Sequence, residues 1–131
     1  MPESERSLIS GCVISYQESD RIADCLRSLS FCDEVVVVDS GSTDGTQAIA
    51  KELGARVIEN VPFPGHRQQK QFAIEQAQHD LVFCLDADER CTEQLQAAIR
   101  DLLQDGVTAD GYQMPRLNHY LGRILRHGLH V

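Results

Sequence analysis

The sequence has 131 residues, about the size of one domain; 42% of them are hydrophobic and 24% are charged. This composition is that of a folded globular protein and carries no signature of disorder. The formal net charge of −8 argues against nucleic acid as the main partner, because phosphate backbones attract basic surfaces.

The first part of the chain alternates between strand and helix patterns. Residues 8–15 form an apolar run that predicts a buried strand. Residues 22–29 carry apolar side chains at helical spacing, and Ser19 is placed to cap that helix. Residues 34–39 contain consecutive valines followed by an acid, which predicts a second strand covered on both faces.

The middle of the chain repeats this alternation. Residues 41–46 predict a turn, and the helix after it is expected to end at Gly54, because glycine commonly follows the last turn of a helix. Residues 55–60 predict a third strand and residues 66–78 a polar helix. Residues 80–86 predict a fourth strand, which leads directly into acids.

A last helix is predicted with Thr92 as its N-cap and Gly106 at its end. Residues 111–118 are expected to be extended, with Pro115 at a sheet edge or a bend. The alternation of strands and helices predicts an α/β fold in a single domain: a Rossmann-like, mostly parallel sheet with helices on both faces. In such sheets ligands bind beyond the carboxyl ends of the strands.

Acidic residues follow three of the four predicted strands. They are Glu18 after the first, Asp39 after the second, and Asp86, Asp88 and Glu89 after the fourth. In an extended chain Asp86 and Asp88 point the same way, roughly 6 to 7 Å apart. Mg²⁺ is commonly held by one or two carboxylates together with water and substrate phosphates. The pair therefore predicts a metal site, and the alternative is a solvated acidic strand end.

The turn after the second strand combines glycine, serine and two acids. Asp39, at the strand tip, is placed to accept hydrogen bonds from a base or a ribose, and Asp44 to cap the following helix. Ser42 and Thr43 are expected to serve only the turn.

Arg67 and Lys70 lie near the start of the predicted polar helix. In a chain this acidic, two cations facing an acidic rim would neutralise a diphosphate. A solvated helix face is the alternative, and spacing alone does not decide between them.

The five cysteines include no C-x-x-C pair, which argues against a disulfide framework and a zinc site. A reducing, cytoplasmic location is expected. Residues 1–7 are polar and predict a flexible terminus rather than a signal peptide. No apolar stretch reaches the roughly 20 residues that a membrane span needs.

Residues 112–131 carry three arginines and no acids. Such a basic segment predicts contact with phosphate, an acidic partner or an anionic lipid surface, so peripheral contact with the inner face of a bacterial membrane is one expectation. The alternative is a chance bias in a short segment.

Four stretches, taken in order, resemble family 2 glycosyltransferases with the GT-A fold. They read "CVISYQESDRIADCLRSL", "DEVVVVDSGSTDGTQAIAKELGARVI", "GHRQQKQFAIEQAQHDLVFCLDADER" and "GYQMPRLNHYLGRILRHG", and they cover nearly the whole chain. The segments "QKQFA", "LDADER" and "RLNHYLGRILRHG" are most similar to the branch that adds sugars to the lipopolysaccharide core of bacteria.

The resemblance implies a nucleotide-diphosphate sugar donor, such as a UDP-sugar, a Mg²⁺ or Mn²⁺ ion, a saccharide or lipid-linked acceptor, and transfer with inversion. Carried over by position, Tyr16 and Glu18 would lie by the nucleoside, and Asp39 would bind the base or ribose. Arg67 or Lys70 would approach the uracil or the diphosphate.

At the metal, the resemblance implies that Asp88 is the direct ligand and that Asp86 faces the ribose or a metal-bound water. Two departures from the family pattern matter. Ser40 stands where many members have a second acid, and the catalytic base of the family lies in an acceptor-binding half that would follow Val131. Glu89 is a nearby acid, but its position speaks against that role.

We therefore expect residues 1–131 to form a donor-binding half, with residues 112–131 as the start of the acceptor half. The alternative is a non-catalytic nucleotide-sugar-binding or assembly module. A metal-dependent phosphatase or receiver-like domain ranks lower, because both lysines, Lys51 and Lys70, precede the fourth strand. Half of a GT-A domain would leave a sheet edge uncovered, so self-association is also expected.

Overall fold

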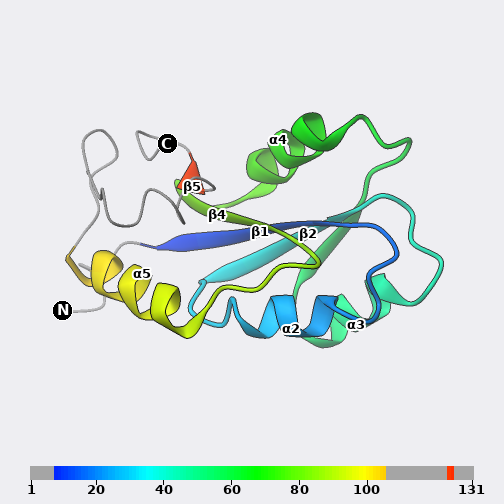
Figure 1. Cartoon of the computed structure of the whole chain (residues 1–131). Helices are drawn as coiled ribbons and strands as arrows, with labels where there is room; N and C mark the ends of the chain where they lie inside the picture. Colours follow the sequence, from blue (N-terminus) through cyan, green and yellow to red (C-terminus); the bar gives the residue numbers. More distant parts are fainter. Residues whose placement is uncertain (1–7, 106–123, 126–131) are drawn as a thin grey trace.

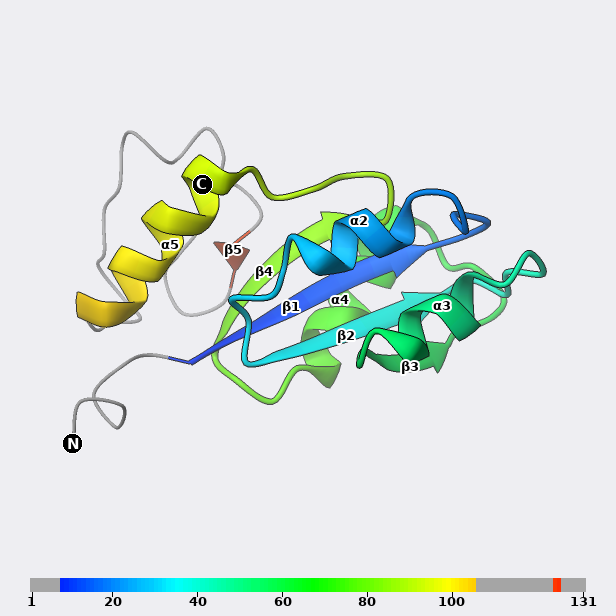
Figure 2. The same cartoon turned by 90° about the horizontal axis from the view of Figure 1, so that it is seen from below.

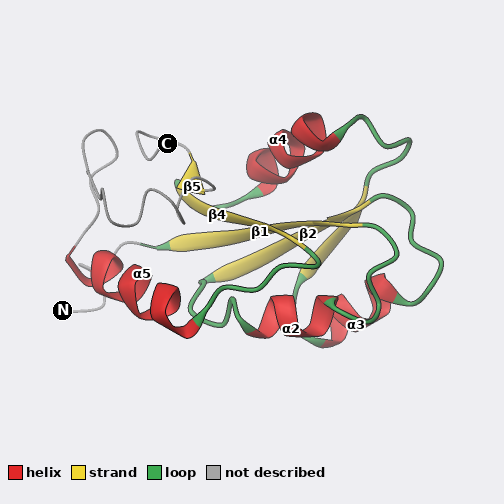
Figure 3. Cartoon of the chain, in the orientation of Figure 1, coloured by secondary structure: helices red, strands yellow, loops and turns green. Residues whose placement is uncertain are grey.

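The computed structural model describes residues 8–105 and 124–125 (Figure 1). Strands and helices alternate along the chain, as Figure 3 shows by colour. The elements are β1 (Ile9–Ser15), α2 (Ile22–Arg27), β2 (Glu34–Asp39), α3 (Thr46–Glu52), β3 (Arg56–Glu59), α4 (His66–Gln76), β4 (Leu81–Asp86), α5 (Glu93–Asp105) and β5 (Ile124–Leu125). The predicted α/β alternation is therefore confirmed, with boundaries within a few residues.

The strands form one sheet in the order β3-β2-β1-β4-β5. Strands β1 to β4 pair in parallel, and the short β5 pairs antiparallel with β4. The mostly parallel sheet predicted from the sequence is confirmed. Because the four parallel strands point the same way, their carboxyl ends meet at one edge of the sheet.

Helices cover both faces of this sheet. Figures 1 and 2 show α4 on one face, and α2, α3 and α5 on the other. Side chains that alternate along the strands divide into two cores accordingly. One core joins the strands to α2, α3 and α5, with Phe83 and Ile99 among its fully buried members. The other, which includes Cys12 and Val36, packs against Ala73 of α4.

The helix ends predicted at Thr92 and Gly54 are confirmed. The Thr92 hydroxyl accepts a hydrogen bond from the Leu95 amide at 3.2 Å, as an N-cap does. Gly54 follows α3 in the left-handed conformation, with φ of 92°. Its amide bonds to Lys51 and the next amide to Ala50, the hydrogen-bond pattern of a Schellman motif.

The capping role predicted for Ser19 is wrong. Helix α2 begins at Ile22, and Arg21 precedes it without a side-chain cap. The Glu18 carbonyl accepts the amides of Arg21 and Ile22 instead. The Ser19 amide donates to Asp44 of another loop, so a tertiary contact replaced the local one.

None of the helices in the described part of the chain combines the length and apolar character needed to cross a bilayer. Several predictions fall outside the described residues: the flexible terminus of residues 1–7, the end at Gly106, the extended residues 111–118, and all but two residues of the basic segment 112–131.

Candidate functional site

The carboxyl ends of the parallel strands bring the predicted acids to one edge. Ser15 pairs with Asp39, which pairs with Glu59, and Ile14 pairs with Asp86 on the other side. A cleft of about 470 Å³ opens there. The residues that line it are Ile14, Ser15, Tyr16, Glu18, Ser40, Phe63, His66, Asp86, Ala87 and Asp88. Its volume is within the range of small-molecule sites.

A tight turn presents the two acids that follow β4. The Asp86 amide donates to the Glu89 carboxylate at 2.9 Å, and the Asp86 carbonyl accepts the Glu89 amide at 2.9 Å. The Ala87 amide continues the ladder to the Ile14 carbonyl. Asp88 is exposed in the cleft, whereas Glu89 serves the turn. These hydrogen bonds hold Asp86 and Asp88 at the cleft, and they do not use the carboxylate of either residue.

Asp86 has one oxygen suited to a cation. Its Oδ1 atom is buried and accepts no hydrogen bond, and Lys70 Nζ lies 3.6 Å away as its ionic partner. A buried carboxylate oxygen without a donor is costly unless a cation compensates it. Asp88 adds a second hard oxygen ligand in the same cleft. These residues fit a Mg²⁺ or Mn²⁺ ion that draws its other ligands from water and phosphate.

The described residues contain no group of three or more His, Cys, Asp or Glu that could hold a metal ion. A site that was complete within this part of the protein, as structural zinc and calcium sites are, is therefore not present there. A two-carboxylate arrangement of Asp86 and Asp88 depends on the ligand to complete the coordination shell.

Asp39 does not face the cleft. Its side chain is fully buried at the end of β2, and protein groups donate to both of its oxygens. Oδ1 accepts from the hydroxyls of Ser15 and Ser42, at 2.6 and 2.7 Å. Oδ2 accepts from the amides of Gly41 and Ser42 and from the Gln47 side chain, at 2.6 to 2.9 Å. The structure therefore places this carboxylate as the organising centre of the loop that follows β2.

Burial alone would raise the pKa of Asp39, but the hydrogen bonds from Ser15, Ser42 and Gln47 outweigh it and hold the pKa below its ordinary value of 3.8. A carboxylate with a depressed folded pKa stabilises the protein above its unfolded pKa. That contribution is lost as the pH falls through the folded pKa.

We expect the free energy of unfolding to show this dependence. The wild-type protein should lose more stability between pH 5 and pH 3 than Asp39→Asn, because the asparagine side chain does not titrate. The gap, which is the difference between their free energies of unfolding, should therefore narrow on acidification. Urea unfolding at pH 7, 5, 4 and 3 measures the gap. A gap that stays constant or widens below pH 4 would contradict the assignment.

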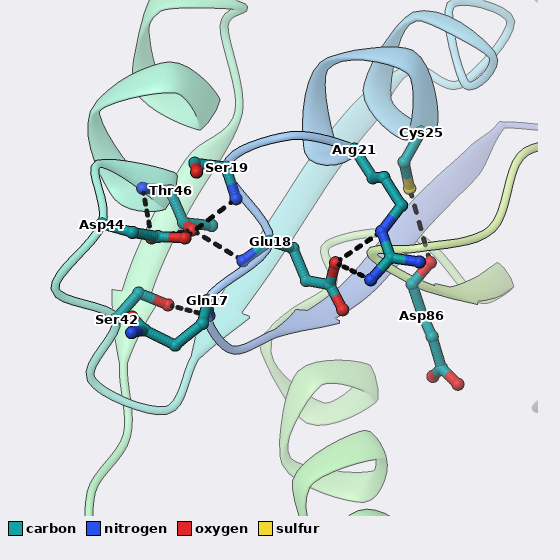
Figure 4. Close-up of polar contacts among 9 residues, drawn as sticks. All are labelled: Gln17, Glu18, Ser19, Arg21, Cys25, Ser42, Asp44, Thr46 and Asp86. Carbon is teal, nitrogen blue, oxygen red and sulfur yellow. Dashed lines mark hydrogen bonds and ion pairs between the residues drawn. The ribbon is translucent and has the colours of Figure 1, made fainter.

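The loop after β1 is fastened to the loop after β2. Three successive backbone amides of the first loop donate to side chains of the second (Figure 4). The pairs are Gln17 with Ser42, Glu18 with Thr46 and Ser19 with Asp44, at 2.7, 3.0 and 3.1 Å. Asp44 also accepts from the amide of Thr46, the first residue of α3, and so contacts the helix start as predicted, from the position before the N-cap residue Gly45. The prediction that Ser42 and Thr43 serve only the turn is wrong, because the hydroxyls of both accept hydrogen bonds from Gln17.

Tyr16 and Glu18, which this loop carries, both reach the cleft. Tyr16 is 58% exposed, so its ring is available to a ligand. Glu18 forms an ion pair with Arg21 at 3.0 Å, which Figure 4 draws as dashed lines. The Glu18 side chain is 18% exposed and that of Arg21 61%, so the guanidinium offers the accessible charge of the pair.

The two predicted cations have different positions. Neither is among the residues that line the cleft, but Lys70 pairs with Asp86, which does line it, whereas Arg67 is exposed on α4. Binding of a diphosphate by either residue stays a prediction, and the geometry favours Lys70.

Four residues near the cleft were not predicted from the sequence: Phe63, His66, Gln69 and Asn60. Phe63 and His66 line it and contact each other edge to face, with ring centroids 5.3 Å apart. Gln69 is fully buried; its amide donates to Ser40 at 3.1 Å, and its Oε1 accepts from Asn60 at 2.7 Å. Gln69 lies four residues before the buried Ala73 and shares its face of α4, but a polar side chain gives no sequence signal of burial, and the glutamines at residues 68 and 71 are exposed.

Comparison with known proteins gives the site a context. A family model described as "Glycosyl transferase family 2" matches residues 10–127. The lipopolysaccharide core biosynthesis glycosyltransferase LpsC of Rhizobium meliloti (strain 1021) is 35% identical over 118 residues, which span 87% of this chain and 44% of LpsC. An uncharacterized glycosyltransferase of Rickettsia prowazekii is 42% identical over 119 residues, which span 87% of this chain and 40% of that protein.

A solved structure shares the architecture. Glucosyl-3-phosphoglycerate synthase from Mycobacterium tuberculosis, in complex with Mn²⁺, UDP-glucose and phosphoglyceric acid, superposes with a TM-score of 0.56 at 28% identity. The match covers 68% of this chain and 37% of that one. This chain therefore spans less than half the length of the relatives described here.

Proposed function

The chain belongs to glycosyl transferase family 2, and we propose that it forms the donor-binding half of an enzyme that transfers a sugar from a nucleotide-diphosphate sugar, such as a UDP-sugar. The observation that carries the proposal is the cleft beyond the parallel strands, where Asp88 is exposed and one oxygen of Asp86 lacks a hydrogen-bond donor. A donor diphosphate with a divalent ion has the charge and the oxygen ligands that such a pair requires.

Asp88 and Asp86 would hold the Mg²⁺ or Mn²⁺ ion. When bound, the ion supplies a Lewis acid for the departing diphosphate. Tyr16 and Glu18 flank the nucleoside, with the exposed Tyr16 ring as a stacking surface for the base. Lys70 of α4 provides a positive charge beside Asp86.

For Asp39 we propose an indirect role. Because both of its oxygens already accept hydrogen bonds and its side chain is fully buried, it shapes the loop that carries Ser40 to the cleft. Direct contact with a base or ribose would require one of those bonds to be exchanged.

The similarity to LpsC, a glycosyltransferase of lipopolysaccharide core biosynthesis, supports a saccharide or lipid-linked acceptor such as that core. We further propose transfer with inversion, at the cytoplasmic side of the membrane. An inverting transfer needs a base to deprotonate the acceptor hydroxyl. Glu89 is engaged with the turn after β4, so we place the base in an acceptor-binding half outside this chain.

Binding of UDP measured by calorimetry tests the donor site. We expect UDP to bind at least about tenfold more tightly with Mn²⁺ than with a chelator, and more tightly than UMP, because the second phosphate would add oxygen ligands and negative charge for the ion. Equal affinity with and without Mn²⁺, or equal affinity for UMP and UDP, would contradict the metal and diphosphate assignments.

A non-catalytic nucleotide-sugar-binding or assembly module is the second candidate. A sugar-transfer assay on the 131-residue chain, run beside the same assay on the chain with any downstream extension, separates the two. Transfer by either would exclude the binding module, whereas donor binding without transfer by both supports it.

A further inference from the structure

The ion pair between Lys70 and Asp86 lacks a direct hydrogen bond. Nζ lies 3.6 Å from Oδ1, which is longer than a hydrogen bond of about 2.8 Å between an ammonium and a carboxylate. Oδ1 is buried and accepts no hydrogen bond. The lysine therefore compensates the charge of this oxygen without a directed bond to it.

The helix backbone that carries Lys70 is firmly held. The preceding residue, Gln69, is fully buried and hydrogen-bonds to Ser40 and Asn60, and Ala73 packs into the core against the sheet. The Lys70 side chain is different, because it is 32% exposed and ends in a compact ammonium on a flexible stem. Its charge can thus leave Asp86 while α4 stays in place.

A divalent ion held by Asp86 and Asp88 would share the Asp86 carboxylate with the lysine, whose Nζ atom lies 3.6 Å from Oδ1. Two cations on one carboxylate repel each other in a partly buried cleft. Without other anions, a bound ion would therefore favour release of the ammonium into water.

We propose that Lys70 is the internal counter-cation of Asp86, which a divalent ion displaces and which the donor diphosphate then binds. Lys70 in this way couples the two ligands: it opposes the metal alone and favours the metal together with the diphosphate. The inference rests on the proposed donor site and adds an order to it, because the metal and the diphosphate bind tightly only together.

The two lysines of the chain supply a matched pair of variants. Lys51 is exposed on α3, outside the cleft, so Lys51→Met makes the same change in charge and side chain as Lys70→Met. Binding of Mn²⁺ is followed by the electron paramagnetic resonance signal of the free ion, with and without saturating UDP. Thermal unfolding without metal confirms that each variant is folded.

With Mn²⁺ alone, Lys70→Met should bind the ion roughly threefold to tenfold more tightly than the wild type, because the competing charge is gone. Lys51→Met should match the wild type. The factor by which UDP tightens Mn²⁺ binding should be smaller in Lys70→Met, because the diphosphate no longer has the lysine ammonium to bind. Lys70→Arg retains the charge and should bind Mn²⁺ alone as weakly as the wild type.

Unchanged or weaker Mn²⁺ binding by Lys70→Met, or an effect that Lys51→Met reproduces, would overturn the role of Lys70 while leaving the donor site intact. If the wild type binds no Mn²⁺ even with UDP, the proposed function itself is wrong, and the role of Lys70 with it.

Discussion

Asp88→Ala is expected to abolish the metal-dependent part of UDP binding, with a loss of at least about 100-fold in affinity. Asp88 is exposed in the cleft, and its carboxylate is one of the two that would hold the ion. Removing one of two protein ligands leaves Asp86 alone to bind a metal that Lys70 already opposes. Calorimetry with UDP and Mn²⁺ measures the loss.

The same substitution should leave the protein folded, within about 0.5 kcal/mol of the wild-type stability, because Asp88 is exposed. Asp101→Ala is the matched control, since Asp101 is exposed on α5 and lies outside the cleft. UDP affinity in the presence of Mn²⁺ should be unchanged in that control. If Asp88→Ala retains metal-dependent binding, the ion is held elsewhere.

Asp39→Ala is expected to lower the free energy of unfolding by about 3 kcal/mol, because it leaves several donors without their acceptor. The hydroxyl of Ser15 and the amides of Gly41 and Ser42 lose a charged partner at the buried end of β2. A loss of this size is a large share of a typical stability of about 5 to 15 kcal/mol. Urea unfolding at pH 7 measures it.

UDP binding should weaken in the same variant even where it remains folded, because Asp39 orders the loop that brings Ser40 to the cleft. Asp24→Ala is the control: Asp24 lies on α2 in an ion pair with Arg27, and both side chains are more than half exposed. Its effect on stability should stay within about 0.5 kcal/mol. An equal loss in both variants would mean that the Asp39 network contributes little.

The elements of this fold were predictable because their patterns are local. The consecutive valines of β2 and the apolar run of β4 predict buried strands whatever their neighbours are, and Gly54 and Thr92 mark helix ends by their own backbone and side-chain chemistry. The prediction for Ser19 failed because α2 begins later, at Ile22, and the Glu18 carbonyl accepts the amides of Arg21 and Ile22. The backbone satisfied donors at the helix start that a serine side chain was expected to satisfy.

The candidate site was predictable in part for a related reason. Acids that follow buried parallel strands must meet at one edge of the sheet, so Asp86 and Asp88 could be assigned to a cleft from their positions alone. The sequence could not show that Asp39 is buried under five hydrogen bonds, nor that Gln69 is buried while its neighbours are exposed. Those facts depend on which side chains converge from loops that lie far apart in the chain.

The sequence by itself determined the order of strands and helices, the parallel sheet and the edge where its acids gather, because periodicity and chain direction are properties of short segments. Only the tertiary structure decided what each acid does there. Asp39 is buried because hydrogen-bond donors from three segments surround it. Asp88 is exposed, and Asp86 forms an ion pair with Lys70. The roles of identical side chains differ because burial and hydrogen-bond partners are set by packing between distant segments.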